Sequence, residues 1–100
     1  MSTYNFHIVG QNQNTNVFNT TLVTNINVDG TDATSLFHMD LDDASNGLGA
    51  LVKIDASQDA GAFTADNIGN ASALQNDLTV LGAQGNNIIN VKDANDRAVT

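Results

Sequence analysis

The sequence contains no Glu, Pro, Cys or Trp, and its only basic residues are Lys53, Lys92 and Arg97. Without cysteine, disulfide scaffolds and thiolate metal sites are excluded. The formal net charge is −8. So few basic residues cannot neutralise a series of phosphates, and they give no attraction to an anionic membrane surface. We therefore expect neither nucleic acid nor a membrane among the partners.

The absence of Glu also bears on the fold. Glu, Lys, Arg and Gln usually fill exposed helix positions, because they lose little rotamer freedom there. Here 15 Asn, 11 Asp and 10 Thr fill the polar positions instead. Asn and Asp favour turns, and Thr favours strands. We expect one domain over residues 1–100 that is mainly β, an antiparallel sandwich or a barrel-like fold.

Alternation of apolar and polar residues predicts the strands. The predicted strands cover residues 3–9, 17–28, 35–42, 48–55 and 88–91, and residues 56–65 are expected to form a loop. The dipeptide Asn46-Gly47 between two of these strands predicts a hairpin. The expected core consists of Phe6, Ile8, Leu22, Ile26, Phe37, Met39, Val52 and Ile54.

One segment has helical spacing. Apolar residues recur every three or four positions between residues 66 and 82, which predicts a short helix near residues 70–82. The run Leu78-Thr79-Val80-Leu81 would also suit a strand. Repeated Asn-Gly and Asp-Gly pairs are compatible with the coils of a solenoid. The apolar runs are unevenly spaced, however, and this favours the sandwich or barrel.

The best metal candidate is the acidic end of the predicted hairpin. Asp40, Asp42, Asp43 and Asn46 offer the oxygen ligands that calcium prefers. A calcium loop that begins at Asp42 would need a bidentate Glu at its twelfth position, where the chain has Lys53. A solvated acidic turn is the alternative, and it fits the pattern better. We expect no other cofactor.

Catalytic signatures are absent from the sequence. It has no Cys nucleophile, no Gly-x-Ser-x-Gly elbow and no phosphate-binding glycine loop, so we do not expect an enzyme. His7 and His38 lie on the polar faces of predicted strands. Zinc sites need three or four ligands, and the spacing supplies no such set, so we expect solvent-facing or interface histidines.

These observations predict a structural subunit. Short β proteins without cysteine that are rich in Asn, Thr and Gly resemble accessory proteins of virus particles, such as capsid decoration or tail components of bacteriophages. The likeness is one of composition and names no family. It implies that the chain packs against copies of itself or other structural proteins, in a virion or an extracellular assembly. Residues 3–9 and 17–28 are the best interface candidates.

Two other functions are compatible with the sequence. A calcium- or carbohydrate-binding β module would rest on residues 40–47, although five aromatic residues in 100 offer little for sugars to stack on. A subunit of a bacterial surface filament or lattice is the second alternative, and it would need an export route. Residues 1–10 do not have the pattern of a signal peptide, and no apolar run approaches the length of a membrane span.

Overall fold

The computed structural model describes residues 2–9, 13–16, 23–41, 50–69, 74–92 and 98–100. These residues form eight strands and no helix. The strands are β1 (Ser2–Ile8), β2 (Gln13–Asn16), β3 (Val23–Gly30), β4 (Leu36–Asp40), β5 (Lys53–Asp59), β6 (Ala62–Ile68), β7 (Thr79–Leu81) and β8 (Asn87–Val91).

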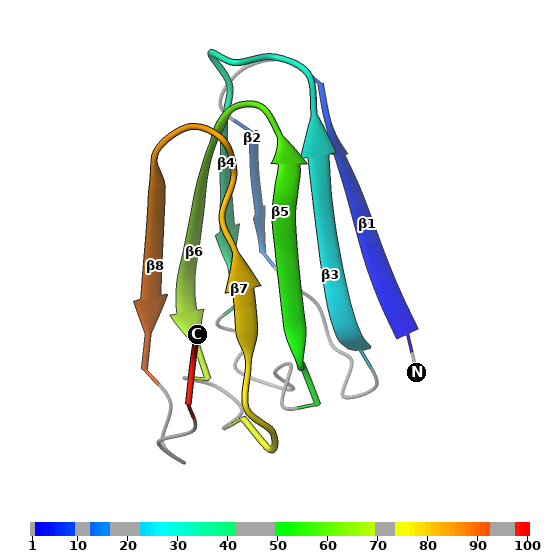
Figure 1. Ribbon diagram of the computed structural model, residues 1–100, viewed down its shortest axis with the longest axis vertical. Helices are drawn as coiled ribbons and strands as arrows, with labels where there is room; N and C mark the ends of the chain where they lie inside the picture. Colours follow the sequence, from blue (N-terminus) through cyan, green and yellow to red (C-terminus); the bar gives the residue numbers. More distant parts are fainter. Residues whose placement is uncertain (1, 10–12, 17–22, 42–49, 70–73, 93–97) are drawn as a thin grey trace.

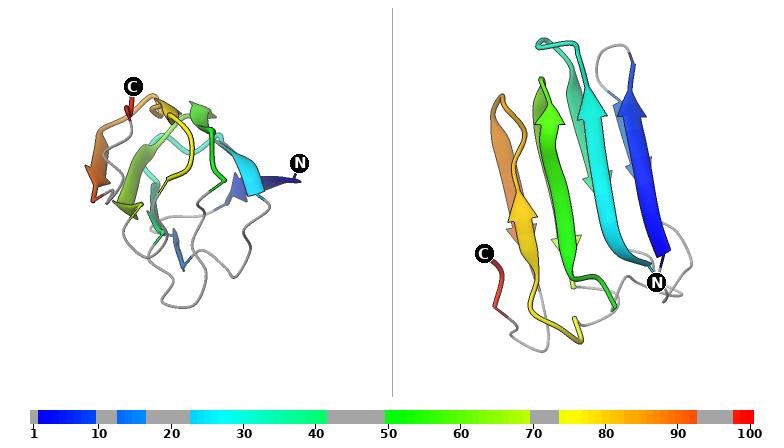
Figure 2. Two further views of the ribbon diagram at one scale, coloured as in Figure 1. Left: turned by 90° about the horizontal axis from the view of Figure 1, so that it is seen from below. Right: turned by 45° about the vertical axis from the view of Figure 1, so that its right-hand side comes forward.

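The strands build two four-stranded sheets, and every strand pair within them is parallel. Sheet A has the order β1-β3-β5-β7, and sheet B has the order β2-β4-β6-β8. The chain therefore crosses to the other sheet after every strand, and the strands of sheet B run opposite to those of sheet A (Figure 1). The result is a parallel β-solenoid in which each coil contributes one strand to each sheet. Figure 2 shows the two sheets facing each other as open layers.

The predicted antiparallel sandwich or barrel is wrong, because the pairing is parallel and the sheets are not closed. Alternation of apolar and polar residues shows that one face of a strand is buried. It does not show the direction of the neighbouring strand, because side chains alternate in the same way in parallel and antiparallel sheets. The repeat is also uneven. One column of sheet A runs from Tyr4 to Ile26, Ile54 and Val80, so successive coils advance by 22, 28 and 26 residues.

Two further predictions are corrected by the structure. The strands of the predicted hairpin lie in different sheets, since β4 pairs with β2 and β6 while β5 pairs with β3 and β7. The helix near residues 70–82 is replaced by β7, and Leu78 just before it forms a parallel bridge to Val99. Residues 70–73 lie outside the described part. Nowhere in that part is there a helix long and apolar enough to cross a membrane.

The core fills the space between the two sheets. Phe37 and Phe63 are register partners in sheet B, and their buried rings stack with centroids 6.1 Å apart. Ile26 and Ile54 are partners in sheet A and are fully buried. Burial of this kind is the main favourable term in folding. Of the predicted core, Ile8, Ile26, Phe37, Met39 and Ile54 are buried, Phe6 is half-buried, Val52 is 36% exposed and Leu22 lies outside the described residues.

Successive coils touch backbone to backbone at the short turn between the sheets. Ala62 N–H donates to Ser35 O over 2.9 Å, and Gly85 N–H donates to Gly61 O over 2.9 Å. A Cβ atom on Gly61 would lie 2.5 Å from Ser35 O, and one on Gly85 would lie 2.7 Å from Gly61 O. Only glycine permits so close an approach. This corner fixes how one coil sits on the next.

Candidate interaction surface

The stack of coils has two ends, and these ends carry the edge strands. β1 and β2 form one end, and β7 and β8 form the other (Figure 2). β1 pairs with β3 on one side, and no strand among the described residues pairs with its other side. An edge strand presents unpaired N–H and C=O groups that another strand can bind.

The edge of β7, by contrast, is covered by the last three residues of the chain. Leu78 N–H donates to Ala98 O, and Thr100 N–H donates to Leu78 O, each over 2.9 Å. Val80 N–H donates to Thr100 O over 2.7 Å. Val99 is half-buried and packs against the core. The two ends of sheet A therefore differ, since one edge has a partner segment and the edge of β1 has none among the described residues.

The edge of β1 lacks the usual protection against pairing. Natural proteins guard exposed edges with charged side chains, especially Lys, or with proline. Residues 1–28 contain no Asp, Glu, Lys or Arg, and the chain has no proline. All eleven Asp and all three basic residues lie from Asp29 onward. The first coil, formed by β1 and β2, is thus the part of the solenoid least protected against pairing with another strand.

The same end exposes part of the core. Tyr4 and Phe6 pack against the core but stay half-buried, because one side of their coil has no neighbouring coil in the described structure. Their rings meet edge to face with centroids 6.2 Å apart. The Phe6 ring also lies 5.5 Å from the ring of Phe37 in sheet B. A partner laid over this end would bury these aromatic side chains.

The outer face of sheet B carries a polar network near the ends of its strands. His38 Nε2 lies 2.6 Å from Asp66 Oδ2, and Asn90 Nδ2 donates to the other oxygen of the same carboxylate. Asn67 Nδ2 donates to Asp40 Oδ1 over 2.9 Å. Asn67 adopts the left-handed conformation with φ 61°, which Asn tolerates better than most residues. The network ties β4, β6 and β8 together.

Hydrogen bonds lower the pKa of a carboxyl group on each outer face. Asn90 and His38 lower the pKa of Asp66 below its usual value of 3.8, against an opposing effect of burial, and the positive charge of Lys92 adds to the lowering. In sheet A the hydroxyl of Ser57 donates to Asp55 Oδ1 over 2.6 Å and lowers the pKa of that carboxyl group. These carboxylates stay ionised and serve as hydrogen-bond acceptors.

The predicted calcium ligands are only partly placed. Asp40 ends β4 and is bonded to Asn67, while Asp42, Asp43 and Asn46 lie outside the described residues. No group of three or more His, Cys, Asp or Glu side chains that could hold a metal ion occurs in the described ranges. The calcium site remains a prediction.

The two histidines each meet a carboxylate on the neighbouring strand. His7 of β1 is hydrogen-bonded to Asp29 of β3, and His38 of β4 is hydrogen-bonded to Asp66 of β6. The side chain of His7 is 68% exposed and that of His38 is 37% exposed. Both pairs bridge adjacent coils on the outer faces. They are cross-coil contacts of the solenoid.

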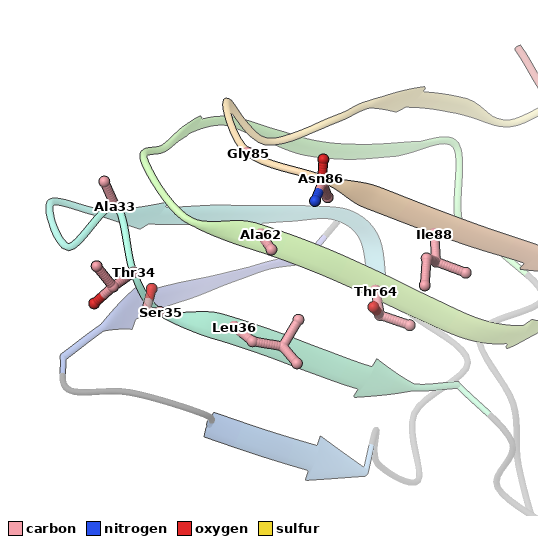
Figure 3. Close-up of a pocket in the computed structure, with 9 residues that line it drawn as sticks. All are labelled: Ala33, Thr34, Ser35, Leu36, Ala62, Thr64, Gly85, Asn86 and Ile88. Atoms are coloured by element: carbon pink, nitrogen blue, oxygen red, sulfur yellow. The ribbon is translucent and has the colours of Figure 1, made fainter.

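The described part of each sheet has a hollow on its outer face. The hollow on sheet B, about 440 Å³, is lined by Leu36, Thr64 and Ile88 and closed at one end by the Ser35 and Gly85 turns (Figure 3). The hollow on sheet A, about 290 Å³, is lined almost entirely by amide and carboxylate side chains. Its lining residues are Asn5, Asn27, Val28, Asp29, Asp55 and Gln58.

The two interface candidates that the sequence predicts occupy different positions in sheet A. Residues 3–9 match β1, which lies at the edge of sheet A. Of residues 17–28, the described part belongs to β3, which lies between β1 and β5 and has no free edge. The charge-free stretch of residues 1–28 was the available signal for the first coil. No protein-family model, curated protein or solved structure matches the chain.

Proposed function

We propose that this chain is a non-enzymatic structural protein that assembles with protein partners through the end coils of its solenoid. The observation that carries the proposal is the uncharged edge of β1, which has no partner strand in the described structure. An exposed edge binds another strand through main-chain hydrogen bonds, and side chains on alternate positions add specificity.

The solenoid architecture favours this mode of binding. Each coil contacts only the coils on either side of it, so a partner coil at the end continues a pattern that already exists. The half-buried Tyr4 and Phe6 would be covered at the same time. A partner strand therefore gains both backbone hydrogen bonds and apolar burial without a rearrangement of the interior.

Within this class we propose an accessory component of a virus particle, such as a capsid decoration or tail protein of a bacteriophage. The support is the compositional likeness together with the uncharged edge of β1. The location would be the virion or an extracellular assembly. A subunit of a bacterial surface filament is the alternative, because it would use the same edges.

Site-specific photo-crosslinking in the producing cells tests the proposal. A photoreactive residue is placed at Thr3 in β1, at Ile88 in β8, and at Gln58 in the central strand β5 as a matched exposed position. We expect Thr3 or Ile88 to crosslink to protein, and the products to sediment with large particles. Gln58 should give far less product.

The outcomes separate the proposal from general stickiness. Equal crosslinking from all three positions would point to nonspecific contact and contradict a role for the end coils. A complete lack of products at Thr3 and Ile88 in assembled material would contradict the proposal directly. Mass spectrometry of the products identifies whether the partner is a second copy or another protein.

The polar hollow on sheet A favours a second candidate function, binding of a carbohydrate. Asn5, Asn27, Asp55 and Gln58 line it, and such side chains donate and accept hydrogen bonds as sugar hydroxyls require. A register shift between Asn27 and Asp29 marks the same place, and such irregularities are common at functional sites. NMR titration with neutral oligosaccharides tests this function, which requires shifts confined to these residues.

A further inference from the structure

We propose that the edge of β1 binds β1 of a second copy of this chain, in antiparallel orientation, to form a two-fold symmetric dimer. The inference rests on the proposed function and names the partner at one end of the solenoid. Two-fold dimers are the commonest protein oligomers, and their interfaces bring the same surface of both subunits together.

The charge distribution selects this end. Each chain carries a net charge of −8, so two copies repel each other over most of their surface. The first 28 residues have no formal charge, and the nearest carboxylate is Asp29 of β3. With β1 paired to β1, the two β3 strands lie three strand spacings apart, about 14 Å. That separation exceeds the Debye length of about 8 Å at physiological ionic strength, so the repulsion is screened.

The pairing of the edge strands among the described residues points to the same end. The edge of β7 is already occupied by residues 98–100, which hydrogen-bond to Leu78 and Val80. In sheet B, β8 is followed directly by the charged Lys92. At the other end β1 is seven residues long, uncharged, and without a partner on its outer side among the described residues. A second copy laid there would also cover Tyr4 and Phe6, which their own coil leaves half-buried.

Two-fold symmetry fixes the orientation of the paired strands. A two-fold axis perpendicular both to the stack of coils and to the strands reverses the strand direction, so the two β1 strands run antiparallel and sheet A continues from one copy to the other. An axis through the middle of Ser2–Ile8 places Asn5 opposite Asn5 of the second copy. Asn5 is exposed and points outward, where its Oδ1 accepts a hydrogen bond from Asn27 Nδ2 over 3.1 Å.

The test measures the dimer dissociation constant by analytical ultracentrifugation of the full chain and two lysine variants. Thr3 and Thr79 occupy the same column of sheet A, because the register runs from Thr3 through Asn25 and Lys53 to Thr79. Both threonines are exposed. We expect Thr3→Lys to weaken the dimer by at least about tenfold, since lysine protects strand edges. Thr79→Lys makes the same charge change at the other end and should leave the dimer unchanged.

A mixing experiment with two variants of Asn5 tests the symmetry. Asn5→Lys and Asn5→Asp each place like charges across the two-fold axis, so each alone should be monomeric. Their equimolar mixture should form a heterodimer, because a Lys then faces an Asp across the axis. Circular dichroism spectra matching that of the wild type confirm that both variants fold.

Several results would overturn the inference. A wild-type chain that stays monomeric at millimolar concentration would exclude the dimer. Equal weakening by Thr3→Lys and Thr79→Lys would place the contact elsewhere, and failure of the Asn5 mixture to associate would exclude the two-fold arrangement. In each case, crosslinks from Thr3 or Ile88 to a different protein in the producing cells would leave the proposed structural function standing, while the absence of crosslinks from both positions would remove both proposals.

Discussion

His38 Nε2 lies 2.6 Å from Asp66 Oδ2 and thereby links β4 to β6 on the outer face of sheet B. Asn90 of β8 donates to the other oxygen of the same carboxylate. One side chain thus holds three successive coils together. The side chain of Asp66 is 27% exposed, so these contacts lie at the border between surface and interior.

This arrangement predicts the acid stability of the fold. Because the folded state lowers the pKa of Asp66 below 3.8, its contribution to stability is present above about pH 4 and is lost as the pH falls through the lowered value. Thermal unfolding followed by circular dichroism from pH 7 to pH 2 should show a steady melting temperature down to about pH 5 and a decline below pH 4.

The variant Asp66→Asn isolates this contribution. It should lose about 1 kcal/mol of unfolding free energy at pH 7 and show a shallower acid decline than the wild type. Asp77→Asn, which removes the same charge at an exposed position, serves as the control and should leave both properties unchanged. An acid decline that is equally steep in Asp66→Asn would contradict this role.

The corner glycine Gly61 sets the spacing between coils. A Cβ atom at this position would lie 2.5 Å from both the O and Oγ atoms of Ser35, so Gly61→Ala should destabilise the protein by about 2 kcal/mol or more. Ala60→Gly, one residue earlier, should cost no more than about 1 kcal/mol. Chemical denaturation measures both. Equal small losses would show that the coils do not touch at this corner.

Asp59 carries a second prediction about stability. Its side chain is fully buried, and its Oδ1 accepts a hydrogen bond from Gly61 N–H over 3.2 Å. Its Oδ2 has no hydrogen-bond partner among the described residues. Burial of a carboxyl oxygen without a hydrogen-bond partner is costly, so Asp59→Ala, which removes this oxygen together with one hydrogen bond, should lower the unfolding free energy by no more than about 1 kcal/mol. A loss of about 3 kcal/mol or more would contradict this account.

Engineered disulfides test the parallel register, and the absence of native cysteine makes the test clean. Asn5 and Asn27 are register partners on adjacent strands, about 4.8 Å apart, which suits a disulfide. The double variant Asn5→Cys and Asn27→Cys should form an intrachain disulfide on mild oxidation. Asn5→Cys with Asp55→Cys places the thiols two strand spacings apart, about 9.6 Å, and should not. The reverse outcome would refute the register.

Some strands of this fold can be predicted from the sequence, because they depend only on the alternation of apolar and polar residues within the strand. Residues 3–9 predict β1 and residues 88–91 predict β8, each within about one residue. Side chains on alternate positions of these strands face the core, and this property needs no knowledge of the partner strand. The same logic correctly places Ile26, Met39 and Ile54 inside.

Other parts depend on information that single strands do not carry. Strand direction follows from the path of the connections, and the Asn46-Gly47 pair wrongly predicts a hairpin between residues 35–42 and 48–55, whose strands β4 and β5 lie in different sheets. Residues 56–65 were predicted to be a loop, but β5 and β6 occupy most of them because neighbouring coils supply backbone partners on both sides. Leu78 has helical spacing to its neighbours, yet pairing with Val99 decides its conformation.

The candidate interaction surface can be predicted only in part from the sequence, because it depends on how the strands pair. The charge-free stretch of residues 1–28 can be counted in the sequence, but it becomes meaningful only once β1 is known to be an edge strand. The acidic segment of residues 40–47 predicts a metal site from local composition alone. In the structure Asp40 hydrogen-bonds to Asn67, a residue 27 positions away that no local pattern connects to it.

Hydrogen–deuterium exchange is the most direct test of the central claim that the first coil is the assembly surface. The exchange of backbone amides in β1 is compared with that in β5 at protein concentrations below and above the point of association. We predict that association slows exchange in residues 2–8 and leaves Lys53–Asp59 unchanged. Exchange in β1 that is the same at every concentration, or new protection in β5 alone, would contradict the account.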